Sequence, residues 1–143
     1  MRVLKFGGTS VGTPESLARV KEIVTARQSA PIVVVSALSG VTDQLIRASR
    51  LAAAGDAAFR GELAALRARH HEVCAATVPD SARRTALLAD LDGLLDRLDR
   101  ICEGTLTSGH LPWRPSTDGL QAITRGGTSI MARLLASSWY VIL

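Results

Sequence analysis

The strongest restriction on the fold is a continuous β-branched run at residues 32–35, Ile-Val-Val-Val. Such a run is typical of a strand in a parallel sheet whose two faces are both covered, because neither face then needs polar side chains. Residues 2–6 form a second apolar run that ends at Gly7 and Gly8, and they predict another strand that enters a tight turn. The two runs therefore predict strands of an α/β protein.

The segment between these two strands carries the signals of a helix. Thr13 supplies an N-cap, and Pro14 stands at the first helical position. Apolar residues then recur on one helical face up to about Arg27. Strand, helix and strand in this order predict a βαβ unit, in which the two strands are parallel.

Helical patterns dominate the remainder of the chain. Thr42 and Asp43 can cap a helix that stops near Gly55. Two longer patterns follow at about residues 57–74 and 80–102, and we expect them to form an antiparallel helical pair. The remaining segments are expected to be a loop at 104–119, a weaker helix at 120–137 and a strand at 139–143.

Length and charge restrict the classes of function. The 143 residues suit one domain, and the formal net charge is +4 at pH 7. Arginines alternate with acids along the predicted helices, which is typical of a solvated face and argues against a nucleic-acid partner. No stretch approaches the ~20 apolar residues of a membrane span, and the first residues lack the apolar region of a signal peptide. We expect a cytoplasmic protein without a membrane partner, whose charge suits a small anionic ligand.

The cysteines and histidines indicate structural roles. Cys74 and Cys102 both fall in predicted helices, and we expect two buried, reduced thiols rather than a disulfide. His70 and Cys74 are one helical turn apart, but a metal site needs three or four ligands. We therefore expect a partly exposed helix face there and no metal. The four aspartates between residues 90 and 99 are expected to pair with arginines of their own helix, Arg97 and Arg100.

The loop after the first strand has the composition of a phosphate site. It follows the C-terminal end of a parallel strand, where ligands bind in open α/β sheets. Gly7 and Gly8 allow backbone N–H groups to approach an anion closely. Thr9 and Ser10 add hydroxyl donors, and Lys5 adds an ammonium group beside the loop. The order differs from the Walker pattern, because the lysine precedes the glycines, and a plain strand–turn–helix connection is the alternative.

A second loop rich in small and hydroxyl-bearing residues follows the β-branched strand. It places Ser36, Ser39 and Thr42 around Gly40. Because the carboxyl ends of neighbouring parallel strands meet at one edge of a sheet, we expect the two loops to converge there. The alternative roles are local, namely helix capping by Thr42 and a structural turn at Gly40, and both are compatible with ligand binding.

Together the two loops resemble the motifs of a known family. Residues 5–11, Lys-Phe-Gly-Gly-Thr-Ser-Val, are similar to the opening of aspartate kinases. Residues 33–42 read Val-Val-Val-Ser-Ala-x-x-Gly-x-Thr and are similar to the family's second motif, at the family's distance from the first. The resemblance implies the amino-acid-kinase fold, a three-layer α/β/α sandwich with a mostly parallel sheet, here truncated. Residues 1–143 would form its N-terminal substrate- and phosphate-binding part, without the nucleotide half and the regulatory domains.

The resemblance also implies an activity. It is phosphoryl transfer from ATP, with Mg²⁺, to the side-chain carboxylate of L-aspartate, the first step toward lysine, threonine and methionine. Lys5 would be the catalytic, charge-neutralising group, while Ser36 and Thr42 would bind aspartate. The residues implied to lie against the ATP phosphates are Lys5, Phe6, Gly7, Gly8, Thr9 and Ser10. The full-length protein is expected to be a homo-oligomer.

One position departs from the family pattern. The family has a Gly-Glu pair at the start of a later helix, and this glutamate binds the amino group of the substrate. Gly127 or Thr128 stands in its place here, and losing a charge-assisted bond costs ~1.5–3 kcal/mol. Two alternatives stay open: a kinase of the same fold with another acceptor, such as glutamate or a nucleoside monophosphate, and a non-catalytic remnant of the family.

Overall fold

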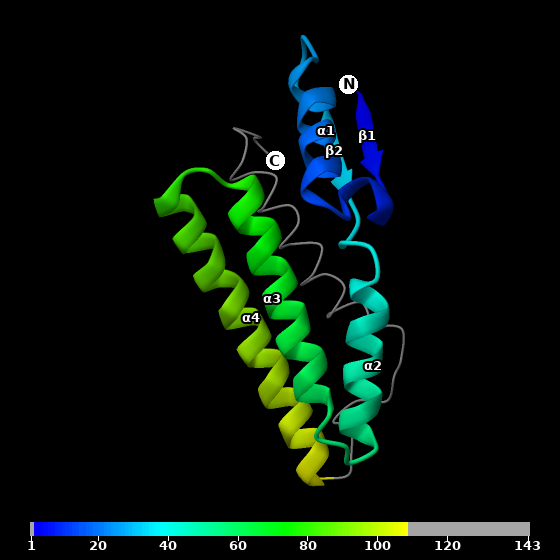
Figure 1. Cartoon of the computed structure of the whole chain (residues 1–143). Coiled ribbons are helices and arrows are strands. Elements are labelled where there is room, and N and C mark those ends of the chain that lie inside the picture. Colours follow the sequence, from blue (N-terminus) through cyan, green and yellow to red (C-terminus); the bar gives the residue numbers. More distant parts are fainter. Residues whose placement is uncertain (1, 109–143) are drawn as a thin grey trace.

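The computed structural model describes residues 2–108 of the chain. Within these residues, two strands and one short 3-10 helix stand among four α-helices (Figure 1). In chain order the elements are β1 (Val3–Phe6), η1 (Gly8–Val11), α1 (Pro14–Thr25), β2 (Ile32–Val35), α2 (Val41–Ala53), α3 (Phe59–Thr77) and α4 (Ser81–Ser108). The predictions for the helix at 120–137, the strand at 139–143, and Gly127 and Thr128 lie outside the described residues.

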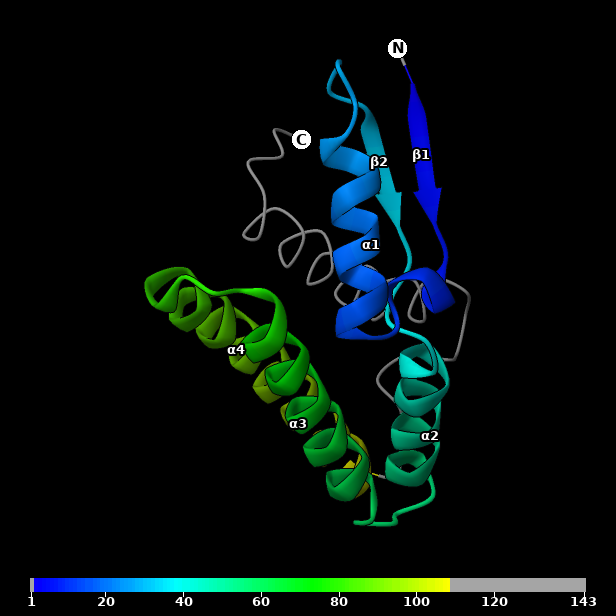
Figure 2. The same cartoon turned by 45° about the horizontal axis from the view of Figure 1, so that its top comes forward.

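β1 and β2 form a parallel pair, and α1 is the crossover between them. The register runs from Val3 opposite Ile32 to Phe6 opposite Val35. Both strands point toward η1 and the start of α2, so their carboxyl ends lie at the same edge (Figure 2). The predicted βαβ unit is confirmed.

α1 begins where the sequence predicts it. The Thr13 hydroxyl accepts the backbone N–H of Ser16 at 3.2 Å, and the Ser16 hydroxyl accepts the backbone N–H of Thr13 at 3.0 Å. This reciprocal capping box precedes Pro14, which stands in the first turn. The helix buries one stripe, formed by Leu17, Val20 and Val24.

The described residues cover only one face of the two-stranded sheet. Leu4, Phe6 and Val33 pack against the same buried cluster as α1, whereas Val3 and Ile32 are 58% and 46% exposed. Alternate residues of a strand lie on opposite faces, and among the described elements α1 runs along this sheet (Figure 2). The expectation that β2 is covered on both faces is therefore not met within residues 2–108.

α2 starts at a glycine and not at a hydroxyl cap. Gly40 is the N-cap, with φ of +80°, and no side chain caps the helix. Thr42 already lies in the first turn, so the predicted capping by Thr42 and Asp43 is wrong. A glycine adopts this left-handed conformation without a Cβ penalty, which makes an early helix start possible. The predicted stop is confirmed, since α2 ends at Ala53 and Gly55 has φ of +74°.

α3 and α4 form the predicted antiparallel pair, and α2 packs beside α3 (Figure 1). Arg67 of α3 donates to Asp92 and Asp96 of α4. His71 adds a contact of 2.8 Å between its Nε2 and Asp92 Oδ1. These two aspartates therefore pair across the helices, and the expected pairing within α4 is wrong for them, because the facing helix brings partners closer.

α4 extends to Ser108, past the point where the sequence predicts a loop. Gly104 lies inside the helix, and a Cβ there would meet no atom within 4 Å. Thr105 is fully buried, and its hydroxyl donates to the Ile101 carbonyl at 2.9 Å. Packing of the buried turn thus overrides the weak helix propensity of glycine and threonine. Residues 109–119 of the predicted loop lie outside the described part.

The two cysteines are buried and free, as predicted. Burial, with the charge of Asp99 as a second and smaller cause, raises the pKa of Cys102 to about 11, so this thiol is protonated at neutral pH. His70 is also buried, at 3% exposure, so the expected partly exposed face around His70 and Cys74 is wrong. Among the helices within residues 2–108, none has the length and apolar character needed to cross a membrane.

Candidate functional site

Two loops emerge side by side from the carboxyl ends of the strands. The backbone N–H of Ser36 donates to the Phe6 carbonyl at 3.0 Å, which continues the parallel pairing one step beyond β2. The first loop then turns immediately, with the Ser10 N–H donating to the Gly7 carbonyl at 2.9 Å. The second loop leads through Ala37 to Gly40 and into α2. Both loops therefore start at the same edge of the sheet.

Glycines bring these loops into direct contact. A Cβ at Gly8 would lie 3.2 Å from the Ala37 carbonyl oxygen and 3.5 Å from Ser39 Cα. A Cβ at Gly12 would lie 3.3 Å from the Ser39 Cβ. A side chain at either position would press the loops apart. The predicted convergence of the two loops is confirmed by these contacts.

The predicted site residues differ in exposure. Lys5 is exposed on the open face of the sheet, opposite Val34 in the register. The hydroxyl-bearing residues Thr9, Ser36 and Thr42 are also exposed, so their side chains are accessible to a ligand. Half-buried positions are Phe6, Gly7, Gly8 and Ser10. Phe6 packs against the core and its carbonyl accepts the Ser36 N–H, so both its side chain and its carbonyl serve the fold.

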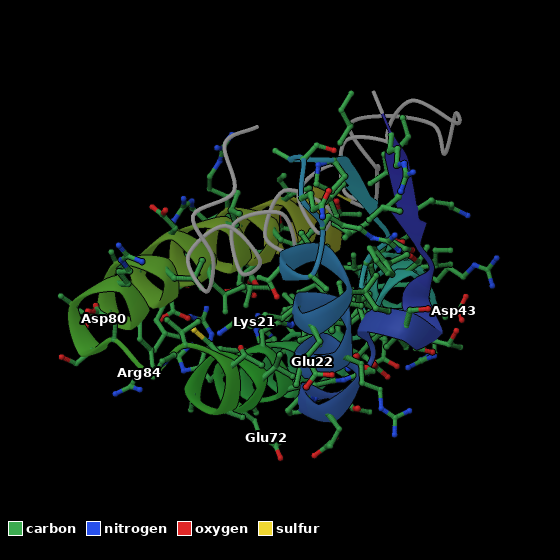
Figure 3. All side chains as sticks on the ribbon, turned by 90° about the horizontal axis from the view of Figure 1, so that it is seen from above. Lys21, Glu22, Asp43, Glu72, Asp80 and Arg84 are labelled. Carbon is green, nitrogen blue, oxygen red and sulfur yellow. The ribbon has the colours of Figure 1, made fainter. Side chains whose placement is uncertain are left out.

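The N-terminus of α2 opens at this same edge. Gly40 offers no side-chain oxygen, and the first turn has no side-chain cap. Uncapped N–H groups at a helix start favour an anionic group, through direct hydrogen bonds and through the helix dipole. Asp43 also lies in this first turn and extends outward in Figure 3.

One residue of the site was not predicted from the sequence. Arg69, from the middle of α3, donates from Nη1 to the Ser39 carbonyl at 2.7 Å and from Nη2 to the Gly12 carbonyl at 3.3 Å. It thus contacts both loops at once. An arginine in a helix that also carries acids is typical of a solvated face, so the sequence offers no signal for this contact.

The described residues provide no cluster for a metal ion. Within residues 2–108, no three His, Cys, Asp or Glu side chains come together in a way that could hold one. The buried His70 uses Nδ1 for the Leu66 carbonyl at 2.7 Å, and His71 contacts Asp92. The polar groups at the converging loops are backbone amides, hydroxyls, Lys5, Asp43 and Arg69.

A cavity of about 350 Å³ lies elsewhere, away from the converging loops. It is lined by residues before and within β1 and by the segment that joins α1 to β2, namely Arg2, Leu4, Ala26, Arg27, Gln28, Ser29 and Pro31. None of the predicted site residues lines it. The candidate site is thus separate from this cavity and is formed by the two loops at the edge of the sheet.

Comparison with known proteins agrees with this architecture. A family model described as the amino acid kinase family matches residues 1–141. An aspartokinase of Chlamydia trachomatis is 45% identical over 71 residues, which are 50% of this chain and 16% of that relative. An aspartokinase of Chlamydia muridarum is 58% identical over 43 residues, which are 30% of this chain and 10% of that relative.

Two solved structures have the same fold. The crystal structure of E. coli aspartokinase III in complex with aspartate and ADP (R-state) matches with a TM-score of 0.77 and 21% identity. The structure of the same protein in complex with lysine and aspartate (T-state) matches with a TM-score of 0.75 and 19% identity. Each match covers 96% of this chain and 28% of the other chain.

Proposed function

The chain belongs to the amino acid kinase family, and we propose that it is part of an aspartate kinase, which transfers a phosphoryl group from ATP to the side-chain carboxylate of L-aspartate. The observation that carries the proposal is the close packing of the two loops at Gly8 and Ala37. It brings the glycine-rich loop after β1 and the hydroxyl-bearing loop after β2 to one place. Two reactants in such a reaction need a shared site of this kind.

Phosphoryl transfer suits the groups at this edge. The reaction depends mainly on positioning and on neutralising negative charge, and it needs no protein nucleophile. The aspartate carboxylate is itself the nucleophile and is ionised at neutral pH, so no general base is needed. Lys5 is the exposed ammonium beside the loops and would neutralise charge on the transferred group.

Each loop has a separate role in the proposal. The backbone of Gly7 and Gly8, with the hydroxyls of Thr9 and Ser10, would hold the ATP phosphates. Ser36 and Thr42 would hydrogen-bond aspartate, and the uncapped start of α2 would favour one of its carboxylates. Mg²⁺ would come with the ATP phosphates and would help to neutralise their charge, as it does in sites that bind it through one or two carboxylates and the substrate.

Proteins similar to this chain support aspartate and a nucleotide as its ligands. The aspartokinase III structure was solved with aspartate and ADP, and both Chlamydia relatives are aspartokinases. The matched segments span only 16% and 10% of those relatives, so the catalytic activity of the relatives comes to this chain as a proposal. Cytoplasmic location and homo-oligomeric assembly belong to that same proposal.

A thermal-shift experiment tests the proposal. The chain is melted with Mg-ATP, with L-aspartate, with both, and with L-glutamate as the alternative acceptor. A ligand at roughly 100 times its Kd stabilises the folded state by about 2.7 kcal/mol, which raises the melting temperature measurably. We expect shifts with Mg-ATP and aspartate and a smaller shift with glutamate. A larger shift with glutamate would assign a different acceptor.

The non-catalytic alternative has one observation in its favour. Gly127 or Thr128 stands where the family has the glutamate that binds the substrate amino group. A melting temperature that millimolar aspartate and Mg-ATP leave unchanged would favour the non-catalytic remnant over a kinase.

A further inference from the structure

Arg69 is the one described side chain that hydrogen-bonds both loops of the candidate site. Its guanidinium reaches Ser39, 30 residues away in the sequence, and Gly12, 57 residues away. Both acceptors are backbone carbonyls, and they belong to different loops. The two loops are therefore connected through a residue of a third element, α3, in addition to their own contact at Gly8 and Ala37.

The shape of the guanidinium group explains why an arginine stands here. Its donors lie in a rigid, planar fork, so two acceptors that it binds are held at a fixed separation. A lysine offers a compact ammonium on a flexible stem and cannot impose that separation. A Cβ at Gly40 would lie 3.9 Å from Arg69 Nη1, so the fork also lies beside the N-cap of α2.

The packing of α3 holds the Arg69 guanidinium in place. Leu66, His70 and Val73, on neighbouring turns of the helix, are buried. α3 is also tied to α2, because Gln44 Nε2 donates to the Glu62 carbonyl at 3.1 Å and Arg47 pairs with the Glu62 carboxylate. Arg69 itself is half-buried: its bond to the Gly12 carbonyl is partly shielded from water, whereas its bond to the Ser39 carbonyl is exposed.

We propose that Arg69 is a positioning residue, which fixes the loop of residues 7–12 and the loop of residues 37–40 at the separation at which they accept a ligand. It contacts neither reactant and acts through the two backbone carbonyls. The identity of the ligand rests on the proposed function, whereas the positioning of the loops does not. The role is thus open to a test without any ligand.

The first test measures hydrogen–deuterium exchange of the ligand-free, full 143-residue chain. In Arg69→Ala, amides of residues 7–13 and 37–44 are expected to exchange at least about tenfold faster, the change expected when one charge-assisted hydrogen bond is lost. Arg84→Ala is the matched control, because Arg84 Nη1 donates to the Val78 carbonyl at 3.0 Å and is also half-buried. Figure 3 shows Arg84 near the α3–α4 turn, on the other side of the molecule from Asp43.

The control separates a local effect from a loss of stability. Arg84→Ala should leave exchange in the two loops unchanged, and both variants are compared at equal free energy of unfolding by adjusting temperature. Arg69→Lys, which keeps the charge, is expected to restore less than half of the lost protection on a logarithmic scale. The positioning role of Arg69 would be overturned if the loop amides of Arg69→Ala exchanged as slowly as those of the wild type. It would also be overturned if Arg69→Lys restored the full protection.

The second test titrates Mg-ADP and L-aspartate into the same variants by calorimetry. If the wild type binds them, Arg69→Ala should weaken binding at least about tenfold while Arg84→Ala does not. If the wild type binds neither ligand but loop exchange still rises in Arg69→Ala, the proposed function fails and the positioning role stands. Wild-type binding that survives Arg69→Ala unchanged overturns the inference and leaves the proposed function intact.

Discussion

Gly8 lies so close to Ala37 that a Cβ at position 8 would stand 3.2 Å from the Ala37 carbonyl oxygen. Most Cβ contacts are longer, and the atom that it meets is backbone, which yields less easily than the end of a side chain. This contact joins the loop after β1 to the loop after β2. The space between the two loops is therefore set by the absence of a side chain at one residue.

Gly8→Ala should consequently separate the loops. We expect it to lower the free energy of unfolding by about 1–3 kcal/mol, the usual cost of inserting a methyl group into a packed site. Gly7→Ala is the matched control, because a Cβ at Gly7 meets no atom within 4 Å and its backbone is extended, with φ of −77°. Chemical denaturation of both variants checks the difference. Equal stability of the two would show that the loops are not in close contact.

Gly40→Ala is expected to destabilise the start of α2. Gly40 has φ of +80°, a conformation that costs an alanine about 1–2 kcal/mol. Gly93 is a comparison for which we expect a change of the opposite sign. It lies inside α4, and a Cβ added there would meet no atom within 4 Å. Gly93→Ala should stabilise the chain by about 0.5–1 kcal/mol. Denaturation curves test both signs, and a stabilising Gly40→Ala would exclude the left-handed N-cap.

His70 should make stability fall in mild acid. Burial holds the pKa of His70 below its ordinary 6.5; the Leu66 carbonyl opposes this shift, and the charges of Arg69 and His71 add to it. Below pH 6.5 the unfolded chain therefore takes up a proton that the folded chain does not. The free energy of unfolding decreases as the pH falls from 6.5 toward the lower pKa of the folded state. Above this range His70 does not change the free energy of unfolding with pH.

The variant His70→Leu isolates this contribution. Denaturation of the wild type and of the variant between pH 5 and 8 gives two stability curves, and all other groups contribute to both. We expect the wild-type curve to drop more steeply below pH 6.5. Parallel curves across that range would mean that His70 titrates alike in the folded and unfolded chain.

Lys5→Ala should separate function from stability. Lys5 is exposed, and within residues 2–108 its side chain makes no hydrogen bond or ion pair, so its loss should change the free energy of unfolding by less than about 0.5 kcal/mol. In the complete enzyme the same change should abolish phosphoryl transfer, since it removes the charge that neutralises the transferred group. A coupled assay of ATP consumption measures this. Turnover near the wild-type rate would remove Lys5 from the catalytic role.

Local signals were enough to predict the strands and the first helix. The β-branched run forms β2, and the stretch before Gly7 forms β1. Thr13 and Pro14 stand at the start of α1, as predicted. Each of these signals acts over a few residues. The convergence of the two loops could also be predicted, because parallel strands joined by one crossover must end at the same edge.

The remaining features depend on contacts that the sequence does not display. Gly40 and not Thr42 is the N-cap of α2, with φ of +80°, and it follows Ser39, whose carbonyl accepts a hydrogen bond from Arg69 of α3. α4 continues through Gly104 because Thr105 is buried by the packed helices. Arg69 could not be recognised, since both of its acceptors are backbone carbonyls and lie 30 and 57 residues away.

The two loops are proposed to form one ligand site. Amide NMR of the full chain tests this shared site most directly. Mg-ADP and L-aspartate are titrated together while the N–H signals of residues 7–10 and 39–42 are followed. The account predicts that both groups of signals move together and saturate at the same ligand concentration, while signals around Arg84 stay in place. Signals that move in only one loop, or in neither, would contradict a shared site.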